Sequence, residues 1–247
     1  MAAIQGVEGH GLTATRSSLS EKIYADLRLA LMSGVYEPGD RLNIRKIAVT
    51  NDTSPTPARE AVMQLVREGA LELKPGYQPR VPVLSADQYI KIREVRVPLE
   101  RLATELATVR VTNELLDQLV ELDKQFIDAE HRRSWKEAMS ANQAFHFSIY
   151  NASGNEVLVR MIENLWLLTG PFVHKQYLSL PRLPSDSDLH TQIIDALRRR
   201  MPNEAGDLIV QDMREGFRII LQHLLHAKAS LRGKRPNANT TKTNGKY

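Results

Sequence analysis

The helical spacing of apolar residues between positions 86 and about 226 is the strongest constraint on this fold. Apolar residues recur there at three- and four-residue intervals, and no alternating strand pattern follows residue 83. Amphipathic helices bury their apolar stripes against one another, so this region is predicted to be an all-helical antiparallel bundle. Pro98 lies inside its first helix and is expected to kink it or disturb one turn. Helices are expected near residues 86–109, 113–131, 135–152, 155–178, 186–200 and 203–226.

The preceding region, residues 18–82, has a different pattern. Its helices are predicted at residues 18–34, 43–50 and 55–68. Alternating apolar residues then flank Lys74-Pro-Gly-Tyr77, which predicts a β-hairpin. Three helices followed by a hairpin are typical of a winged helix-turn-helix, so the chain is expected to be mainly α-helical with two different domains.

The two ends of the chain are expected to lie outside these domains. Residues 1–17 are predicted to be flexible, and residues 227–247 to be a disordered basic tail. The tail carries six Lys and Arg residues and no acid, whereas the whole chain has a formal charge of +4, so the remainder is slightly negative. The basic pI therefore does not by itself indicate a nucleic-acid surface on the folded domains.

Composition excludes several classes of protein. The chain has no cysteine, which excludes disulfides, thiolate zinc sites and cysteine nucleophiles. It contains no apolar run long enough for a membrane span, and its beginning lacks a signal-peptide pattern. We therefore expect a cytoplasmic protein.

The segment SPTPAREAVMQLVREG, which begins at Ser54, indicates a helix whose first turn can contact an anion. Pro57 fits the start of a helix, and Ser54 or Thr56 can cap it or donate to a phosphate oxygen. Arg59 lies one turn in, within reach of a guanine edge. Taken alone, the segment is better explained as a core helix that begins with prolines and carries solvated charges.

Two further residues extend this predicted DNA-binding surface. Arg45 lies on the preceding helix, where it can clamp the phosphate backbone. Gly76 lies at the hairpin tip, where the absence of a side chain lets the wing approach the minor groove.

The stretch GDRLNIRKIAVTNDTSPTPAREAVMQLVREGALELKPGYQPRV resembles the winged helix of GntR-type bacterial transcription regulators. That family shows PGxxLxExxLA, then SxTPxREALxxLxxEGL, then a glycine-containing wing. The resemblance covers about residues 18–85. It departs from the family at Pro55, where an arginine is usual, which implies an altered sequence preference and lower affinity. The positions that the resemblance assigns to DNA contact are Arg45, Ser54, Thr56, Arg59 and Gly76.

Residues 86–226 resemble the FCD domain of the FadR branch of that family. Three motifs, REVRVPLERLATELA, NQAFHFSIYNASGN and DLHTQIIDAL, occur in the family order. The resemblance implies a buried divalent metal (Zn, Ni or Mn) with a small carboxylic-acid effector beside it.

The metal set that the resemblance implies is altered in this chain. Asn142 stands in place of the family's aspartate, while His146 and His190 are kept, and Asn142 and His146 share one helix face. A gap-free alignment puts Asp212 at the last ligand position, and a gapped one puts Gly216 there. The alternative to a metal site is a pair of hydrogen-bonded pocket histidines.

Three more residues are candidates for contacting the effector. Arg96 occupies the arginine position of the first FCD helix, and its partner is either a ligand carboxylate or Glu100, one turn on. Tyr150 and His174 are further pocket candidates.

These observations predict a ligand-responsive transcription regulator, expected to be a repressor and not an enzyme. Two chains would form a homodimer and present recognition helices about 34 Å apart to a palindromic double-stranded operator.

Two alternative functions remain. A metal-dependent hydrolase on the helical bundle lacks a supporting HExxH motif or carboxylate cluster. The other is a ligand-free dimeric DNA-binding or interaction protein.

Overall fold

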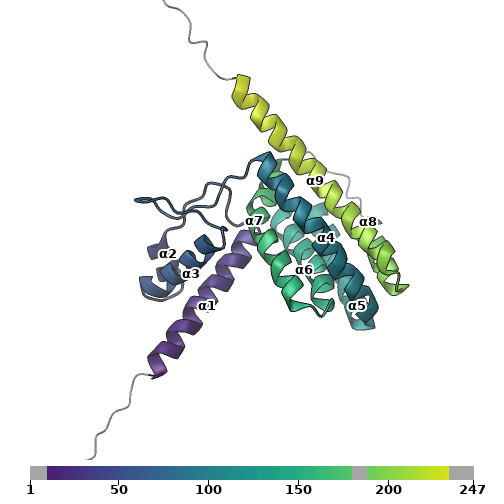
Figure 1. Cartoon of the computed structure of the whole chain (residues 1–247), viewed down its shortest axis with the longest axis horizontal. Coiled ribbons are helices and arrows are strands. Elements are labelled where there is room, and N and C mark those ends of the chain that lie inside the picture. The colour runs from purple at the N-terminus through teal and green to yellow at the C-terminus, as the bar shows by residue number, and fades with distance from the viewer. Residues whose placement is uncertain (1–9, 180–187, 234–247) are drawn as a thin grey trace, which may run out of the picture.

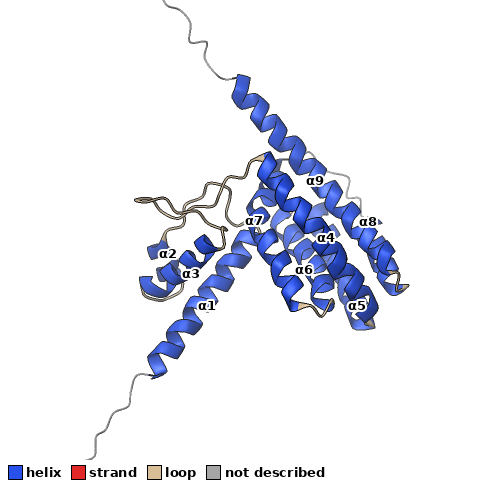
Figure 2. Ribbon diagram, viewed as in Figure 1, coloured by secondary structure: helices blue, strands red, loops and turns tan. Residues whose placement is uncertain are grey.

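The computed structural model describes residues 10–179 and 188–233. In those ranges the chain forms nine α-helices and no regular strand, which confirms the predicted mainly helical fold (Figures 1 and 2). The helices are α1 (His10–Met32), α2 (Ile44–Thr50), α3 (Pro55–Arg67), α4 (Ala86–Arg110), α5 (Asn113–His131), α6 (Trp135–Ala152), α7 (Glu156–Ser179), α8 (Asp188–Arg198) and α9 (Pro202–Gly233). None of the described helices has the length and apolar character needed to cross a bilayer.

Helices α1 to α3 pack around an apolar core of their own. Ile23 of α1 and Leu65 of α3 are fully buried in it, together with Leu71, which follows α3. Asn43 caps α2 by accepting from the backbone N–H of Lys46 at 3.1 Å. This arrangement leaves the first turn of α3 at the surface of the small domain.

The predicted hairpin is present, but it is too short to form regular strands. Glu72 and Arg80 exchange both backbone hydrogen bonds, at 2.8 and 2.9 Å, and Tyr77 N–H donates to Lys74 C=O across the turn. Leu42 N–H also donates to the carbonyl of Pro79, which ties the hairpin to the segment before α2. These contacts make the hairpin a wing beside the helices.

The outer boundaries differ from those predicted. Helix α1 begins at His10 rather than Ser18. The sequence Ser18-Leu-Ser-Glu21 has the Ser-x-x-Glu pattern of a helix start, but this pattern also occurs in helix interiors. Helix α9 continues to Gly233, beyond the predicted end at residue 226, so the first part of the predicted tail is helical. The rest of both predicted ends, residues 1–9 and 234–247, lies outside the described residues.

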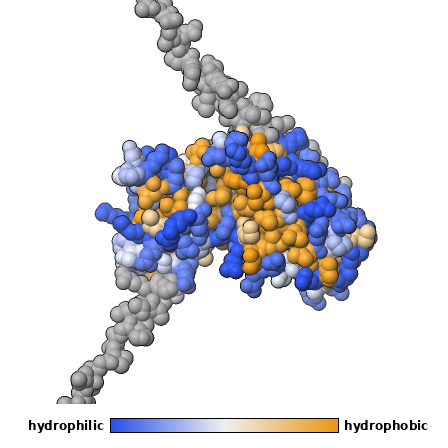
Figure 3. Space-filling view, viewed as in Figure 1, coloured by the Kyte–Doolittle hydropathy of each residue, from blue (hydrophilic) through white to orange (hydrophobic). Residues whose placement is uncertain are grey.

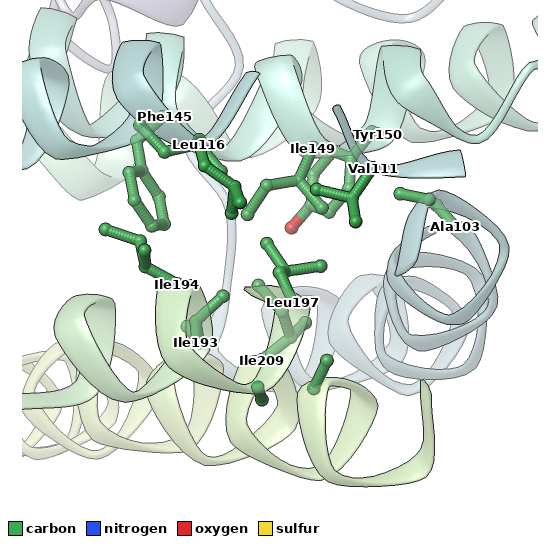
Figure 4. Packing of buried hydrophobic residues seen from close by; sticks show 14 of the residues in the cluster. Ala103, Val111, Leu116, Phe145, Ile149, Tyr150, Ile193, Ile194, Leu197 and Ile209 are labelled. Atoms are coloured by element: carbon green, nitrogen blue, oxygen red, sulfur yellow. The ribbon is translucent and has the colours of Figure 1, made fainter. Parts of the chain in front are cut away.

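Helices α4 to α9 form the second domain around a larger core. Phe145 and Ile149 of α6 meet Ile193 and Leu197 of α8 there, with Ile209 of α9 closing the cluster (Figure 4). Helix α4 runs against α9, and α5 runs against α6. Helix α4 continues through Pro98 to Arg110, so the proline does not end this helix.

The two domains meet where α1 packs on α7. Leu167 of α7 joins the core of the N-terminal domain, and Gly170, almost one turn later, lies against the last turn of α1. In Figure 1, α1 leaves this junction on one side while the bundle extends on the other.

Gly170→Ala is expected to destabilise this junction. A Cβ there would lie 2.7 Å from the backbone carbonyl oxygen of Leu31 and 2.7 Å from the Cα of Met32. Backbone atoms cannot move aside as a side chain would, and overpacking typically costs about 1–3 kcal/mol. Chemical denaturation of the parent and the variant measures this loss.

Gly216→Ala is the matched control, because a Cβ at that helical glycine would meet nothing within 4 Å. Alanine is favoured over glycine inside a helix by about 0.5–1 kcal/mol, so this variant should be as stable as the parent or slightly more. Equal unfolding midpoints for the two variants would contradict the close contact at Gly170.

Candidate functional site

The first turn of α3 presents a small polar surface. Ser54 is the N-cap residue, but its hydroxyl makes no capping hydrogen bond, and Pro55 occupies the first helical position. Ser54, Pro55, Thr56 and Arg59 are exposed, while Pro57 and the apolar side of the helix are buried. The exposed N–H groups and partial positive charge of a helix start suit a phosphate.

Arg45 and Gly76 extend this surface on either side. Arg45 is exposed on α2, and among the described residues neither Arg45 nor Arg59 has an ion-pair partner. Gly76 has a φ of +78° at the wing tip, a conformation that L side chains rarely adopt, and a Cβ there would meet nothing within 4 Å. The predicted DNA-contacting positions therefore lie on α2, the first turn of α3 and the wing.

Three helices bring His146, His190 and Asp212 together in the second domain. One potential ligand atom from each lies within 4.8 Å of the other two. Nε2 of His146 lies 3.2 Å from Oδ2 of Asp212, and both imidazoles are buried. The gap-free alignment that chose Asp212 therefore agrees with the geometry, whereas Gly216 is exposed with open space around it.

Asp123 of α5 orients His190 and was missed by the sequence analysis. Its Oδ1 lies 2.9 Å from Nδ1 of His190, and both side chains are largely buried. Phe145 stacks on the His190 ring with centroids 4.0 Å apart. Since Nδ1 is held by the carboxylate, Nε2 remains as the ligand atom of His190, an arrangement usual for metal-binding histidines.

His146 is oriented by Tyr150, one turn later on α6. The Tyr150 hydroxyl donates to Oε2 of Glu100 at 2.6 Å and lies 3.3 Å from Nδ1 of His146. Burial and the adjacent Glu100 carboxylate raise the pKa of Tyr150 well above its usual value, so the phenol keeps its proton. Its single proton is directed to Glu100, and Nδ1–H of His146 is left to donate to the phenol oxygen. At Nε2, His146 can then hold either a proton shared with Asp212 or a metal ion.

Glu100 is the partner of Arg96, so no ligand carboxylate is needed to balance that arginine. Nε of Arg96 donates to Oε1 of Glu100 at 2.6 Å, and its guanidinium lies 4.6 Å from the ring centroid of Trp166. A second arginine missed by the sequence analysis, Arg93, has a buried Nε without a hydrogen-bond partner and lies over the ring of Phe217. The Arg93 guanidinium therefore keeps an unused Nε donor.

Two predicted site residues have less direct roles. Asn142 is half-buried one turn before His146, and the described residues offer its side chain no hydrogen bond. His174 was predicted to contact the effector, but it packs against Gly34 at the end of α1. The reason is helical spacing, because Leu167, Gly170 and His174 lie on one face of α7, the face that meets α1.

Negative groups outnumber positive groups around the histidine cluster when the imidazoles are neutral. Arg96 and Glu100 balance each other, which leaves Asp123 and Asp212 as two negative groups when the imidazoles are neutral. Burial alone would raise the pKa of Asp212, but the hydrogen bond from His146 and nearby positive charge outweigh it, so that pKa lies below its usual value. Two imidazole nitrogens and an ionised carboxylate fit a divalent ion such as Zn, Ni or Mn.

Comparisons with known proteins agree with both domains. Residues 19–80 match the family "Bacterial regulatory proteins, gntR family", and residues 91–215 match the family "FCD domain". The HTH-type transcriptional regulator McbR of Escherichia coli (strain K12) is 29% identical over 209 residues, which cover 83% of this chain and 94% of McbR. The Exu regulon transcriptional regulator of the same organism is 26% identical over 76% of this chain and 78% of its own length.

The solved structure of E. coli McbR/YncC has the same arrangement of elements. It superposes with a TM-score of 0.78 at 28% identity, covering 83% of this chain and 98% of the McbR chain. The chain therefore belongs to the bacterial gntR family of regulatory proteins and carries an FCD domain, which makes it a DNA-binding regulator of transcription and not an enzyme.

Proposed function

We propose that this regulator is a homodimer that binds a palindromic operator and responds to a small carboxylic acid through a divalent metal in the FCD domain. The observation that carries the proposal is the convergence of His146, His190 and Asp212 within 4.8 Å. The two histidines have their Nδ1 atoms engaged by Tyr150 and Asp123, so their Nε2 atoms can serve as ligands. Three protein ligands leave further coordination positions for a ligand from solution.

The charge of the site supports a metal as the receptor for an acid. Without a cation, Asp123 and Asp212 would repel a carboxylate. A divalent ion offsets both, and Arg93 offers an unused guanidinium donor at the α4–α9 contact. Asn142, half-buried beside His146, supplies an amide oxygen in place of a second carboxylate.

A thermal-shift screen tests whether the acid binds only when the metal is present. Metal-free protein is mixed with mono-, di- and tricarboxylic acids, with and without Zn, Ni or Mn. The expected result is that an acid raises the melting temperature only with a metal, and that the same pair changes operator affinity, as a regulatory ligand must. An acid that stabilises the metal-free protein equally well would contradict the role of the metal. Absence of any metal or acid effect would favour a ligand-free dimeric regulator.

The homodimer is proposed to form through α4. Val95, Leu102 and Val109 are exposed at seven-residue intervals and so form one apolar stripe along this helix. Figure 3 shows apolar surface gathered over the region of α4 and α6. Exposed apolar surface of this kind marks an interaction face, and a symmetric dimer presents the same face from both chains.

Leu102→Glu is expected to convert the dimer into a monomer. A buried, unpaired carboxylate on each chain at a symmetric contact should raise the dimer dissociation constant more than tenfold. Sedimentation velocity over a concentration series measures it. Met201→Glu, at a similarly exposed residue between α8 and α9, should leave the dimer intact. A dimer equally stable in both variants would place the interface elsewhere.

A further inference from the structure

A cavity lies between the two domains, and none of the histidine-cluster residues lines it. Its volume is about 560 Å³, and its walls come from α1 and the end of α3 on one side and from α6 and α7 on the other. In Figure 1, α1 and α6 diverge from the junction of α1 with α7. Small-molecule sites have volumes of this order and occur preferentially at domain interfaces.

Direct contacts between α1 and α7 hold together the two domains that form this inter-domain groove. Gly170 lies against the last turn of α1. Nearby, the Arg28 guanidinium donates to Oε2 of Glu163 at 3.3 Å and to Oδ1 of Asn164 at 3.1 Å, so α1 is tied to α7. Arg28 also donates to the Tyr24 hydroxyl at 2.8 Å. The hydrogen-bonding capacity of Arg28 is therefore largely used within the protein.

Two charged groups of the groove keep unused hydrogen-bonding capacity. Oε1 of Glu68, at the end of α3, accepts from the Tyr24 hydroxyl at 2.6 Å and from Gln64 at 3.3 Å. Oε2 of Glu68 has no hydrogen bond, and the Arg28 guanidinium lies 3.8 Å from it. Arg160 of α7 is exposed, and no described residue forms an ion pair or hydrogen bond with it. The groove thus has an unsatisfied acceptor on the DNA-binding domain and an unpaired cation on the helical domain.

The groove also has apolar walls. Leu29 and Met32 of α1 and Phe147 of α6 are among the residues that line it. The amide side chains of Gln143 and Asn151 also line it and can hydrogen-bond a polar ligand. A ligand that fits has an ammonium group, an apolar body and a carboxylate.

We propose that the inter-domain groove binds a small zwitterion of the amino-acid or short-peptide class. The ammonium group hydrogen-bonds Glu68, the carboxylate pairs with Arg160, and the apolar body contacts Leu29, Met32 and Phe147. Such a ligand contacts both domains at once and stabilises one angle between them. It is a second effector site, and none of its lining residues belongs to the histidine cluster.

Isothermal titration of the full chain with the dipeptide leucyl-leucine tests the proposal. N-acetyl-leucyl-leucine lacks the ammonium and leucyl-leucinamide lacks the carboxylate, so both should bind about tenfold more weakly or not at all. Arg160→Gln should weaken leucyl-leucine binding by a similar factor. Arg198→Gln, at another exposed helical arginine, is the matched control and should leave affinity unchanged.

The same titration separates this site from the proposed metal site. His146→Ala protein should bind leucyl-leucine as the parent does, whatever its metal content. The proposal is overturned if the parent shows no saturable binding, if the two blocked dipeptides bind as well as leucyl-leucine, or if Arg160→Gln and Arg198→Gln behave alike. Because Arg160 is exposed, its replacement is not expected to affect folding, and equal melting temperatures verify this.

Discussion

Arg59→Ala is expected to reduce the preference for the operator over unrelated DNA by about 1–3 kcal/mol, a factor of roughly 5 to 150. Arg59 is exposed one turn into α3 and has no ion-pair partner among the described residues. An arginine so placed can form two hydrogen bonds to one guanine, and alanine forms none. Fluorescence anisotropy with operator and scrambled duplexes at fixed salt measures the ratio.

Arg67→Ala is the control for charge alone. Arg67 is exposed on the same helix but lies at its C-terminal end, away from the first turn. Its loss should change affinity for both duplexes by a similar small factor, because a general electrostatic contribution does not depend on sequence. If Arg59→Ala lowered both affinities equally, Arg59 would be a phosphate contact and not a base-recognising residue.

His146→Ala is expected to abolish the stabilisation of the protein by a divalent metal. A metal at one hundred times its dissociation constant stabilises the folded state by about 2.7 kcal/mol, which for a protein of this size corresponds to a melting shift of roughly 5–11 °C. The variant loses one of the three converging donors and the link from Tyr150 to Asp212. Differential scanning calorimetry with and without Zn, Ni or Mn measures the difference.

His131→Ala controls for unspecific metal binding by surface histidines. His131 is exposed at the end of α5, outside the cluster, so this variant should keep the whole metal-dependent shift. A parent protein whose melting temperature does not respond to any of the three ions would contradict the metal proposal. The two histidines would then be hydrogen-bonded pocket residues, the alternative that the sequence left open.

Local signals predicted the middle of the fold well. Helices α5 and α6 have the boundaries expected from the sequence, because a cap residue and a regular apolar spacing lie within a few residues of each end. Thr112, for example, is the N-cap of α5, and its hydroxyl accepts from the N–H of Leu115. The wing was predicted as a hairpin, but its two sides are joined only by isolated β-bridges. The length over which they pair depends on contacts with the segment before α2, which the local sequence does not indicate.

The site was only partly predictable, because its geometry depends on contacts between distant segments. The order of motifs located His146 and His190, and the gap-free alignment located Asp212; the fold brings the three together. Asp123 pairs with a histidine 67 positions away, and its only sequence signal is an acid on the apolar face of α5. His174 was assigned to the effector pocket, and the packing of α7 on α1 places it at the domain junction instead.

Sequence selection from random duplex DNA with the purified full chain tests whether the protein is a dimer that recognises a palindromic operator through α3. The proposed dimer, with two exposed α3 first turns, predicts enrichment of one motif made of two inverted half-sites, centred about one helical turn of DNA apart or a multiple of it. The enriched motif should also be lost in the Arg59→Ala protein. Enrichment of no motif, or of a single half-site without its inverted copy, would contradict a dimeric regulator that recognises a palindromic operator through α3.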